Sequence, residues 1–198
     1  MVKTFYLVRH AEYVPTETFR GRLPLPLSAA GEEQARRLGQ WFKDKDIKAI
    51  YSSAVFRCQQ TSELMNQSLN VPIINDDRLL EDLSVMQGMS LKEYQKYDDR
   101  PFTFQKDLGG ETPADVQQRI VNFWQEKIKS EDSNIIIVSH GDPLMFLYLT
   151  LRKQNLPATH DLVEKRQELS GDGYQEKGSI RPVVIDGDNI QLQDLITL

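Results

Sequence analysis

Two histidines, each at the end of an apolar run, are the residues of this chain best suited to chemistry. His10 follows the run Thr4–Val8 directly after Arg9, and His140 comes just after the run Asn134–Val138. Ligands bind beyond the carboxyl ends of the strands in an open α/β sheet, so both rings would reach one crevice. Imidazoles beside a guanidinium suit phosphate, because arginine binds phosphoryl oxygens with fixed, forked donors. The sequence therefore predicts a phosphate site built on two strand ends.

Arg57 is a further candidate, because it lies just after Tyr51-Ser52-Ser53 at the expected start of a helix. A helix start offers free backbone N–H groups and the positive end of the helix dipole, and both favour an anion. The alternative for Arg57 is an ion pair on the helix surface. Cys58 is interpreted as a small buried hydrophobe, and His160 as a solvated residue of a polar loop.

The elements that must position these residues alternate between strands and helices. Helical spacing of apolar residues follows Ser28, and Thr112-Pro113 has the form of an N-cap followed by a proline in the first turn. Such alternation predicts an α/β fold, a three-layer sandwich with a mainly parallel central sheet and helices on both faces. The strands are expected at Thr4–Val8, Ile47–Tyr51, Val71–Ile74 and Asn134–Val138, with a closing hairpin of Val183–Ile185 and Ile190–Leu192.

Composition limits the classes of function. The 198 residues suggest one domain, residues 1–198, and the net charge of −5 argues against binding to nucleic acid or an anionic membrane. A single cysteine excludes an internal disulfide, and no set of residues has metal-ligand spacing, so neither metal nor cofactor is expected. No apolar run approaches the roughly 20 residues of a membrane span. We expect a soluble, cytoplasmic protein, and the sequence leaves a homodimer open.

Six motifs occur in the order found in the histidine phosphatase superfamily, also called the phosphoglycerate-mutase-like family. The chain resembles that family over most of its length up to about residue 150, and the ordered set is far more specific than any one motif. The motifs are Leu7–Glu12, Gly21–Ser28 with Gly31, Tyr51–Arg57 with Thr61, Arg78–Glu81, Gly110–Thr112 and Val138–Gly141.

The resemblance implies a phosphate pocket of Arg9, His10, Arg57 and His140, in which His10 is the nucleophile, and it implies that Glu81 is the proton donor. Without it, Glu81 is not distinguishable from its acidic neighbours Asp77 and Asp82. His10 must be neutral, and the adjacent arginines would disfavour its protonation. Glu81 must begin protonated, so we expect Asp82 and the substrate phosphate to raise its pKa. We also expect Arg22 and Gly141 to contribute to substrate binding.

The sequence departs from the family pattern next to the predicted nucleophile. Ala11 replaces a glycine, Tyr13 replaces a hydroxyl residue, and Val14-Pro15-Thr16 lacks an asparagine, which puts an auxiliary phosphate contact in doubt. Two polar stretches, Tyr97–Glu111 and Pro157–Ser179, are expected to be loops or short helices on the rim of the crevice.

The leading functional hypothesis is a phosphomonoester hydrolase that forms a phosphohistidine and acts on a small phosphorylated metabolite. The alternatives are a cofactor-dependent phosphoglycerate mutase and a phosphohistidine-protein phosphatase. A catalytically weak phospho-ligand binding protein is a further alternative, but a binder needs neither a nucleophile nor an acid.

Overall fold

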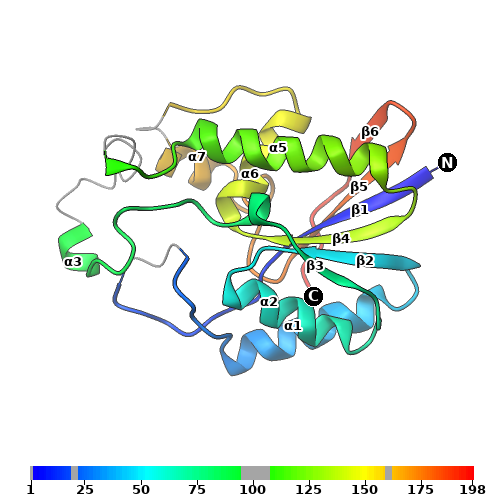
Figure 1. Cartoon of the computed structure of the whole chain (residues 1–198), viewed down its shortest axis with the longest axis horizontal. Coiled ribbons are helices and arrows are strands. Elements are labelled where there is room, and N and C mark those ends of the chain that lie inside the picture. Colours follow the sequence, from blue (N-terminus) through cyan, green and yellow to red (C-terminus); the bar gives the residue numbers. More distant parts are fainter. Residues whose placement is uncertain (1, 19–21, 95–107, 159–161) are drawn as a thin grey trace.

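One mixed sheet runs through the middle of the molecule (Figure 1). The computed structural model describes residues 2–18, 22–94, 108–158 and 162–198, and within them the sheet has six strands in the order β3-β2-β4-β1-β5-β6. The neighbours β3, β2, β4 and β1 are parallel, whereas β5 is antiparallel to both β1 and β6. The strands are β1 (Val2–Arg9), β2 (Ile47–Ser52), β3 (Ile73–Asn75), β4 (Asn134–Ser139), β5 (Ile180–Asp186) and β6 (Asn189–Leu192).

The central strands β1 and β4 are apolar over residues 5–8 and 135–138, because both of their faces are buried there. Phe5, Leu7 and Ile135 lie in the core on one face of the sheet. Tyr6 and Val8 lie in the core on the other face. The parallel register pairs the last residues of the two strands, Arg9 with Ser139, so that the residues after them emerge side by side.

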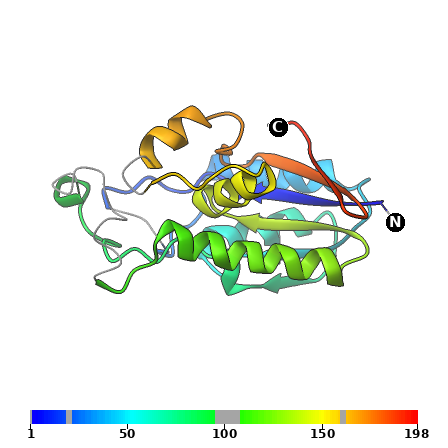
Figure 2. The ribbon, with the colours of Figure 1, turned by 90° about the horizontal axis from the view of Figure 1, so that it is seen from above.

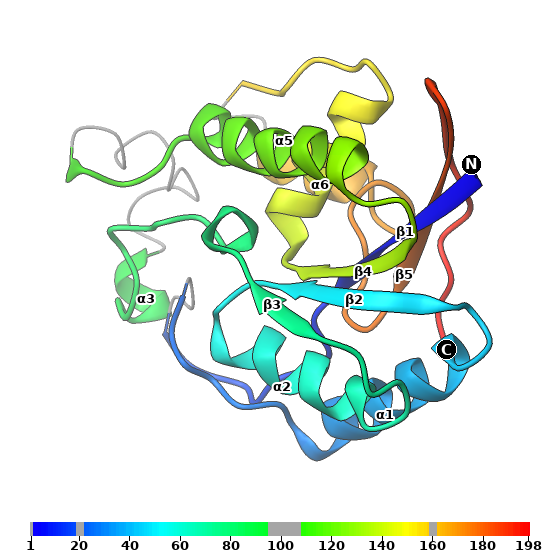
Figure 3. The same cartoon turned by 45° about the vertical axis from the view of Figure 1, so that its right-hand side comes forward.

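Helices cover both faces, as the sequence predicts (Figure 3). The helices α1 (Ala29–Phe42) and α2 (Phe56–Asn66) pack on one face, and α5 (Pro113–Ser130) and α6 (Gly141–Leu151) pack on the other. Thr112 caps α5 as expected, in a reciprocal pair with Asp115, and Ser28 caps α1. The expected α/β sandwich is therefore confirmed.

The short elements α3 (Leu91–Tyr94) and α7 (Leu162–Glu168) lie at the end of the molecule to which β1 and β4 point (Figure 2). The stretch Pro157–Ser179 contains α7, in agreement with the prediction of loops or short helices on the rim. Most of Tyr97–Glu111 lies outside the described residues. In the described part of the chain, no helix is both long and apolar enough to cross a bilayer.

Some predicted boundaries are wrong by one to three residues. The third strand starts at Ile73 rather than Val71, because Pro72 has no N–H to donate and contributes only its carbonyl, which accepts from Ile50. Helix α6 starts at Gly141, with His140 as its N-cap. His140 therefore directly follows strand β4 and caps helix α6.

Candidate active site

His10 and His140 meet beyond the ends of β1 and β4, as their sequence positions predict. The centroids of the two rings are 5.2 Å apart, and both residues are buried. The backbone N–H of His10 donates to the carbonyl of Ser139 at 3.0 Å, which continues the pairing of the two strands by one residue. The strand register therefore fixes the spacing of the two imidazoles.

The hydrogen bonds of His10 define which ring nitrogen is available for chemistry. Its Nδ1 lies 2.8 Å from the carbonyl oxygen of Ala11, which only accepts, so Nδ1 carries the proton. Its Nε2 accepts from Nε of Arg57 at 3.1 Å and holds the lone pair. Burial, reinforced by the charges of Arg57 and Arg9, holds the pKa of His10 well below its ordinary value. The expected neutral imidazole is confirmed, with burial as the larger cause.

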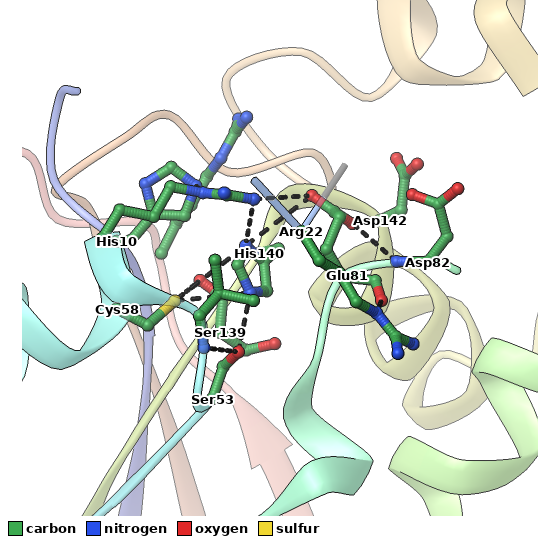
Figure 4. A network of polar contacts seen from close by, with 12 residues as sticks. His10, Arg22, Ser53, Cys58, Glu81, Asp82, Ser139, His140 and Asp142 are labelled. Atoms are coloured by element: carbon green, nitrogen blue, oxygen red, sulfur yellow. Dashed lines mark hydrogen bonds and ion pairs between the residues drawn. The ribbon is translucent and has the colours of Figure 1, made fainter. Parts of the chain in front are cut away.

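Arg57 connects the two histidines. Its Nη2 donates to Nδ1 of His140 at 2.9 Å, so Nε2 of His140 carries the proton and donates to Oγ of Ser53 at 2.8 Å (Figure 4). Burial and the nearby Arg57 also hold the pKa of His140 well below its ordinary value. Arg57 is 2% exposed, which excludes an ion pair on the helix surface. The positive charge of the pocket therefore resides on arginine.

Cys58 is buried against His140, with Sγ 3.4 Å from Nε2 (Figure 4). Burial raises the pKa of its thiol to about 12. A thiol in this state is not a nucleophile at neutral pH, so the interpretation of Cys58 as a small buried hydrophobe is confirmed.

Arg9 is held by the rim segment that follows α7. Its Nη1 donates to the carbonyl of Gln175 at 2.7 Å, and its guanidinium lies 4.9 Å from the ring centroid of Tyr174. Its Nε is buried and has no hydrogen-bond partner among the described residues. A buried donor without a partner is costly, and a phosphoryl oxygen would satisfy it.

Glu81 follows the short 3₁₀ helix η1 (Asp77–Leu79) and faces the histidine pair. Its Oε2 lies 3.7 Å from Nη2 of Arg57 and 3.7 Å from Nδ1 of His140. Burial, then the charges of Asp142 and Asp82, raise the pKa of Glu81 to about 8, although Arg57 opposes them. A carboxyl with this pKa is protonated at neutral pH and donates a proton. The expected direction is confirmed, but neither the burial of Glu81 nor the approach of Asp142 is visible in the sequence.

Three carboxyl groups that are distant in sequence crowd together at this edge. Oxygens of Glu81, Asp82 and Asp142 all lie within 4.8 Å of one another (Figure 4). Nε of Arg166, on α7, donates to Oδ1 of Asp142 at 2.8 Å. Sequence spacing does not reveal this group, because the segment after η1 and the distant helix α6 both contribute to it.

Arg22 and Gly141, the predicted substrate-binding residues, lie near the edge of this group. Nε of Arg22 donates to the backbone carbonyl of Glu81 at 2.7 Å, and its Nη2 donates to Glu111 at 2.8 Å. Gly141 begins α6, and a Cβ there would lie 2.7 Å from the hydroxyl of Tyr174. Substrate contact by either residue stays a prediction, and His160 lies outside the described residues.

Tyr13 brings a further cation towards the pocket. Its ring centroid lies 5.3 Å from that of His10, 5.3 Å from the Arg57 guanidinium and 4.5 Å from Nζ of Lys177. Lys177 also donates to Glu12 at 2.7 Å. No motif marks Lys177 in the sequence, because it lies past the last recognised motif.

The structure thus brings together all five predicted catalytic residues. It adds Ser53 and the segment of Tyr174 and Gln175 as their supports. Ser53 belongs to a recognised motif, but the sequence does not show that its partner is His140. The roles of these five residues stay predictions.

Comparison with known proteins identifies the family. The pattern of the histidine phosphatase superfamily (branch 1) matches residues 5–176. Phosphoserine phosphatase 1 of Hydrogenobacter thermophilus is 31% identical over 163 residues, which cover 76% of each chain. A 2,3-bisphosphoglycerate-dependent phosphoglycerate mutase of Cytophaga hutchinsonii is 29% identical over 163 residues, covering 74% of this chain and 76% of the mutase.

A solved structure gives the same result. YhfR of Bacillus stearothermophilus superposes with a TM-score of 0.80 at 26% identity, covering 96% of this chain and 95% of that chain. Its fold therefore matches the mixed sheet and flanking helices described above. Since the family pattern also spans most of the sequence, this chain belongs to branch 1 of the histidine phosphatase superfamily and is a phosphatase of that family.

Proposed function

We propose that this protein hydrolyses a small phosphorylated metabolite through a phosphohistidine on His10. One observation carries the proposal. The neutral Nε2 of His10 and the protonated carboxyl of Glu81 both contact Arg57, a guanidinium that can bind a phosphoryl group. A nucleophile and an acid on either side of a phosphoryl site are what two-step transfer requires.

In the first step, Nε2 of His10 attacks phosphorus while the bond from phosphorus to the ester oxygen breaks. Glu81 gives its proton to the leaving oxygen, and the alcohol departs. Arg57 moves its N–H groups from the two histidines to the phosphoryl oxygens, and Arg9 contributes its unpaired Nε. The protein supplies positioning and positive charge, the main requirements of phosphoryl transfer.

In the second step, the carboxylate of Glu81 takes a proton from water as the water oxygen attacks phosphorus. The nitrogen–phosphorus bond breaks, inorganic phosphate leaves, and both His10 and Glu81 return to their starting states. The side chain of Glu81 is 17% exposed, so water reaches the group that must activate it. This access supports hydrolysis over mutase activity, because a mutase must exclude water while the phosphohistidine waits.

Phosphate release from a panel of phosphomonoesters tests this function. Phosphoserine, the substrate in the name of one relative, stands first in the panel, followed by sugar phosphates and a phosphohistidine protein. The coupled assay with 3-phosphoglycerate, with and without bisphosphoglycerate, measures mutase activity beside it. Isomerisation faster than every rate of phosphate release would overturn the hydrolase in favour of the mutase.

Rapid quench with a labelled phosphoester tests the intermediate. We expect an acid-labile phosphoryl group on His10, and a loss of turnover on the order of 10⁴-fold or more in His10→Ala, because the whole covalent route disappears. Unreduced turnover in this variant would exclude His10 as the nucleophile.

A further inference from the structure

Glu111 and Arg22 belong to motifs that the mechanism does not use, and they meet behind the backbone of Glu81. Oε2 of Glu111 accepts from Nη2 of Arg22 at 2.8 Å and from the backbone N–H of Leu83 at 2.7 Å. Its Oε1 accepts from Nε of Arg119, on α5, at 2.8 Å. One carboxylate therefore joins three segments that are far apart in the sequence.

The same two arginines also hold the carbonyl groups of the acid segment. The carbonyl of Glu81 accepts from Nε of Arg22 at 2.7 Å and from Nη2 of Arg119 at 3.1 Å. Nη1 of Arg119 donates to the carbonyl of Arg78 at 2.8 Å. Together with Glu111, these arginines hold backbone groups of residues 78, 81 and 83.

This support matters because Glu81 lies outside any helix or strand. The helix η1 ends at Leu79, and the next described helix begins at Leu91, so no ladder of backbone hydrogen bonds fixes the acid. The side chain of Glu81 reaches Arg57 and His140 only at 3.7 Å. A displacement of about 1 Å in such a group costs on the order of 10²-fold in rate.

The charge state of Glu111 suits a permanent support. Partial burial would by itself raise the pKa of Glu111, but the hydrogen bonds and charge of Arg119, with Leu83 and Arg22, hold it below its ordinary value. Glu111 is therefore ionised at neutral pH, where Glu81 holds its proton. The two glutamates are neighbours with opposite protonation states.

We propose that Glu111 is a positioning residue that, through Arg22 and Arg119, fixes the backbone around Glu81 and so aims the acid at the leaving oxygen. This inference rests on the proposed hydrolase function. It assigns Arg22 to the support of the acid in place of substrate binding, because both its Nε and its Nη2 are engaged there.

Glu111→Gln tests the proposal, because it keeps the shape of the side chain and removes its charge. We expect kcat for phosphoserine, whose leaving group needs a proton, to fall about 10- to 100-fold. For a nitrophenyl phosphate, whose leaving group needs little protonation, kcat should change less than about 3-fold. Equal losses on the two esters would show a merely structural role and overturn the proposal.

Glu131→Gln is the matched control. Glu131 lies at the other end of α5 and accepts a hydrogen bond from the hydroxyl of Tyr51 at 2.5 Å, so it too joins a helix end to another segment. An 18-residue helix separates the two glutamates by about 27 Å. We expect this variant to leave the ratio of the two rates unchanged. A ratio altered as much as in Glu111→Gln would count against the proposal.

Arg22→Gln separates support from substrate binding. We expect it to lower kcat for phosphoserine in the same leaving-group-dependent way as Glu111→Gln. A raised KM with unchanged kcat would instead mark Arg22 as a substrate-binding residue and overturn its new assignment.

The double variant Glu81→Gln, Glu111→Gln tests whether the two glutamates act together. Once Glu81 has been replaced, the change at Glu111 should lower kcat for phosphoserine little further. If the two losses in kcat multiply instead, the residues act independently and the proposed coupling is contradicted.

Amide hydrogen exchange tests whether Glu111 supports the backbone around Glu81. It needs no substrate turnover, so its outcome does not depend on the proposed function. In the free protein, Glu111→Gln should increase amide exchange in residues 79–84, while Glu131→Gln leaves it unchanged. Unaltered exchange in this segment would overturn the proposed support even if the enzyme hydrolyses every ester in the panel. Increased exchange would uphold it even if none is hydrolysed.

Discussion

The proposed phosphoryl pocket (Arg9, His10, Arg57 and His140) and the segment around the proposed acid, Glu81, face each other. The two regions are held in place in different ways. His10 and His140 follow paired strands in the centre of the sheet, and their spacing is set by backbone hydrogen bonds. Glu81 lies between regular elements and depends on side chains from distant segments. The pocket is therefore part of the core, whereas the acid is attached to it by a polar network.

This difference predicts two classes of variant. Changes in the pocket should slow every substrate alike, because all phosphoesters present the same phosphoryl group to it. Changes on the acid side should depend on the leaving group, because only a poor leaving group requires the proton. The ratio of rates for an alkyl and an aryl ester thus separates the two regions.

Glu81→Gln should have the largest effect of the variants considered in this comparison. We expect kcat for phosphoserine to fall on the order of 10³-fold, while a nitrophenyl phosphate loses only a few-fold. In the wild type, the rate on phosphoserine should fall as pH rises through about 8, because the acid is lost there. Equal losses on both esters, or an unchanged basic limb in the variant, would exclude Glu81 as the acid.

Arg57→Gln should slow both esters by a similar factor, about 10²-fold. Arg57 donates to both histidines and its Nη2 lies 3.7 Å from Glu81, so its loss removes the charge that meets the phosphoryl oxygens. Steady-state rates on the two substrates measure the effect. If only the rate on the alkyl ester fell, Arg57 would act together with Glu81 on the leaving group. The proposed distinction between the two regions would then be wrong.

Asp142→Asn should shift the pH profile of phosphoserine hydrolysis without abolishing the activity. The charge of Asp142 helps to keep Glu81 protonated, so its removal lowers the pKa of Glu81. The basic limb for phosphoserine should shift about one unit towards lower pH, with little change at pH 6. The nitrophenyl ester serves as the control, because its rate should not follow this limb. If the basic limb does not shift, Asp142 does not raise the pKa of Glu81.

Cys58→Ala should have the smallest effect. The thiol is buried beside His140 and is protonated at neutral pH, so it has packing to contribute and no chemistry. We expect rates within about 3-fold of the wild type and a loss of stability of about 1 kcal/mol, measured by denaturant unfolding. A loss of more than about 10² in rate would show that sulfur takes part in the reaction.

The same contrast explains what the sequence predicts. The apolar runs before His10 and His140 predict their burial, their strands and their common edge, because these are properties of adjacent residues. The position of Arg57 at a helix start is equally local. The fold follows from the alternation of such elements, and the boundaries of the strands differ from the predicted ones by one to three residues.

The acid side is not predictable from local pattern. Asp77, Glu81 and Asp82 are alike in sequence, and only the family motif selects Glu81. Its raised pKa depends on burial and on Asp142, which lies beyond β4. Arg119 and the segment around Gln175 show no motif of their own, and their roles arise from contacts across the fold.

The place of β5 in the sheet has a consequence for biosynthesis. The strand β1 lies between two strands that are synthesised well after it, β4 and β5. The N–H of Gly178 donates to the carbonyls of both Arg9 and His10 at 3.1 Å, just before β5 begins. A nascent chain therefore carries its central strand unpaired on both edges, a state prone to aggregation. Translation must pass Gly178 before these contacts can form, so chains that stop earlier would contain every predicted catalytic residue and yet lack a closed pocket.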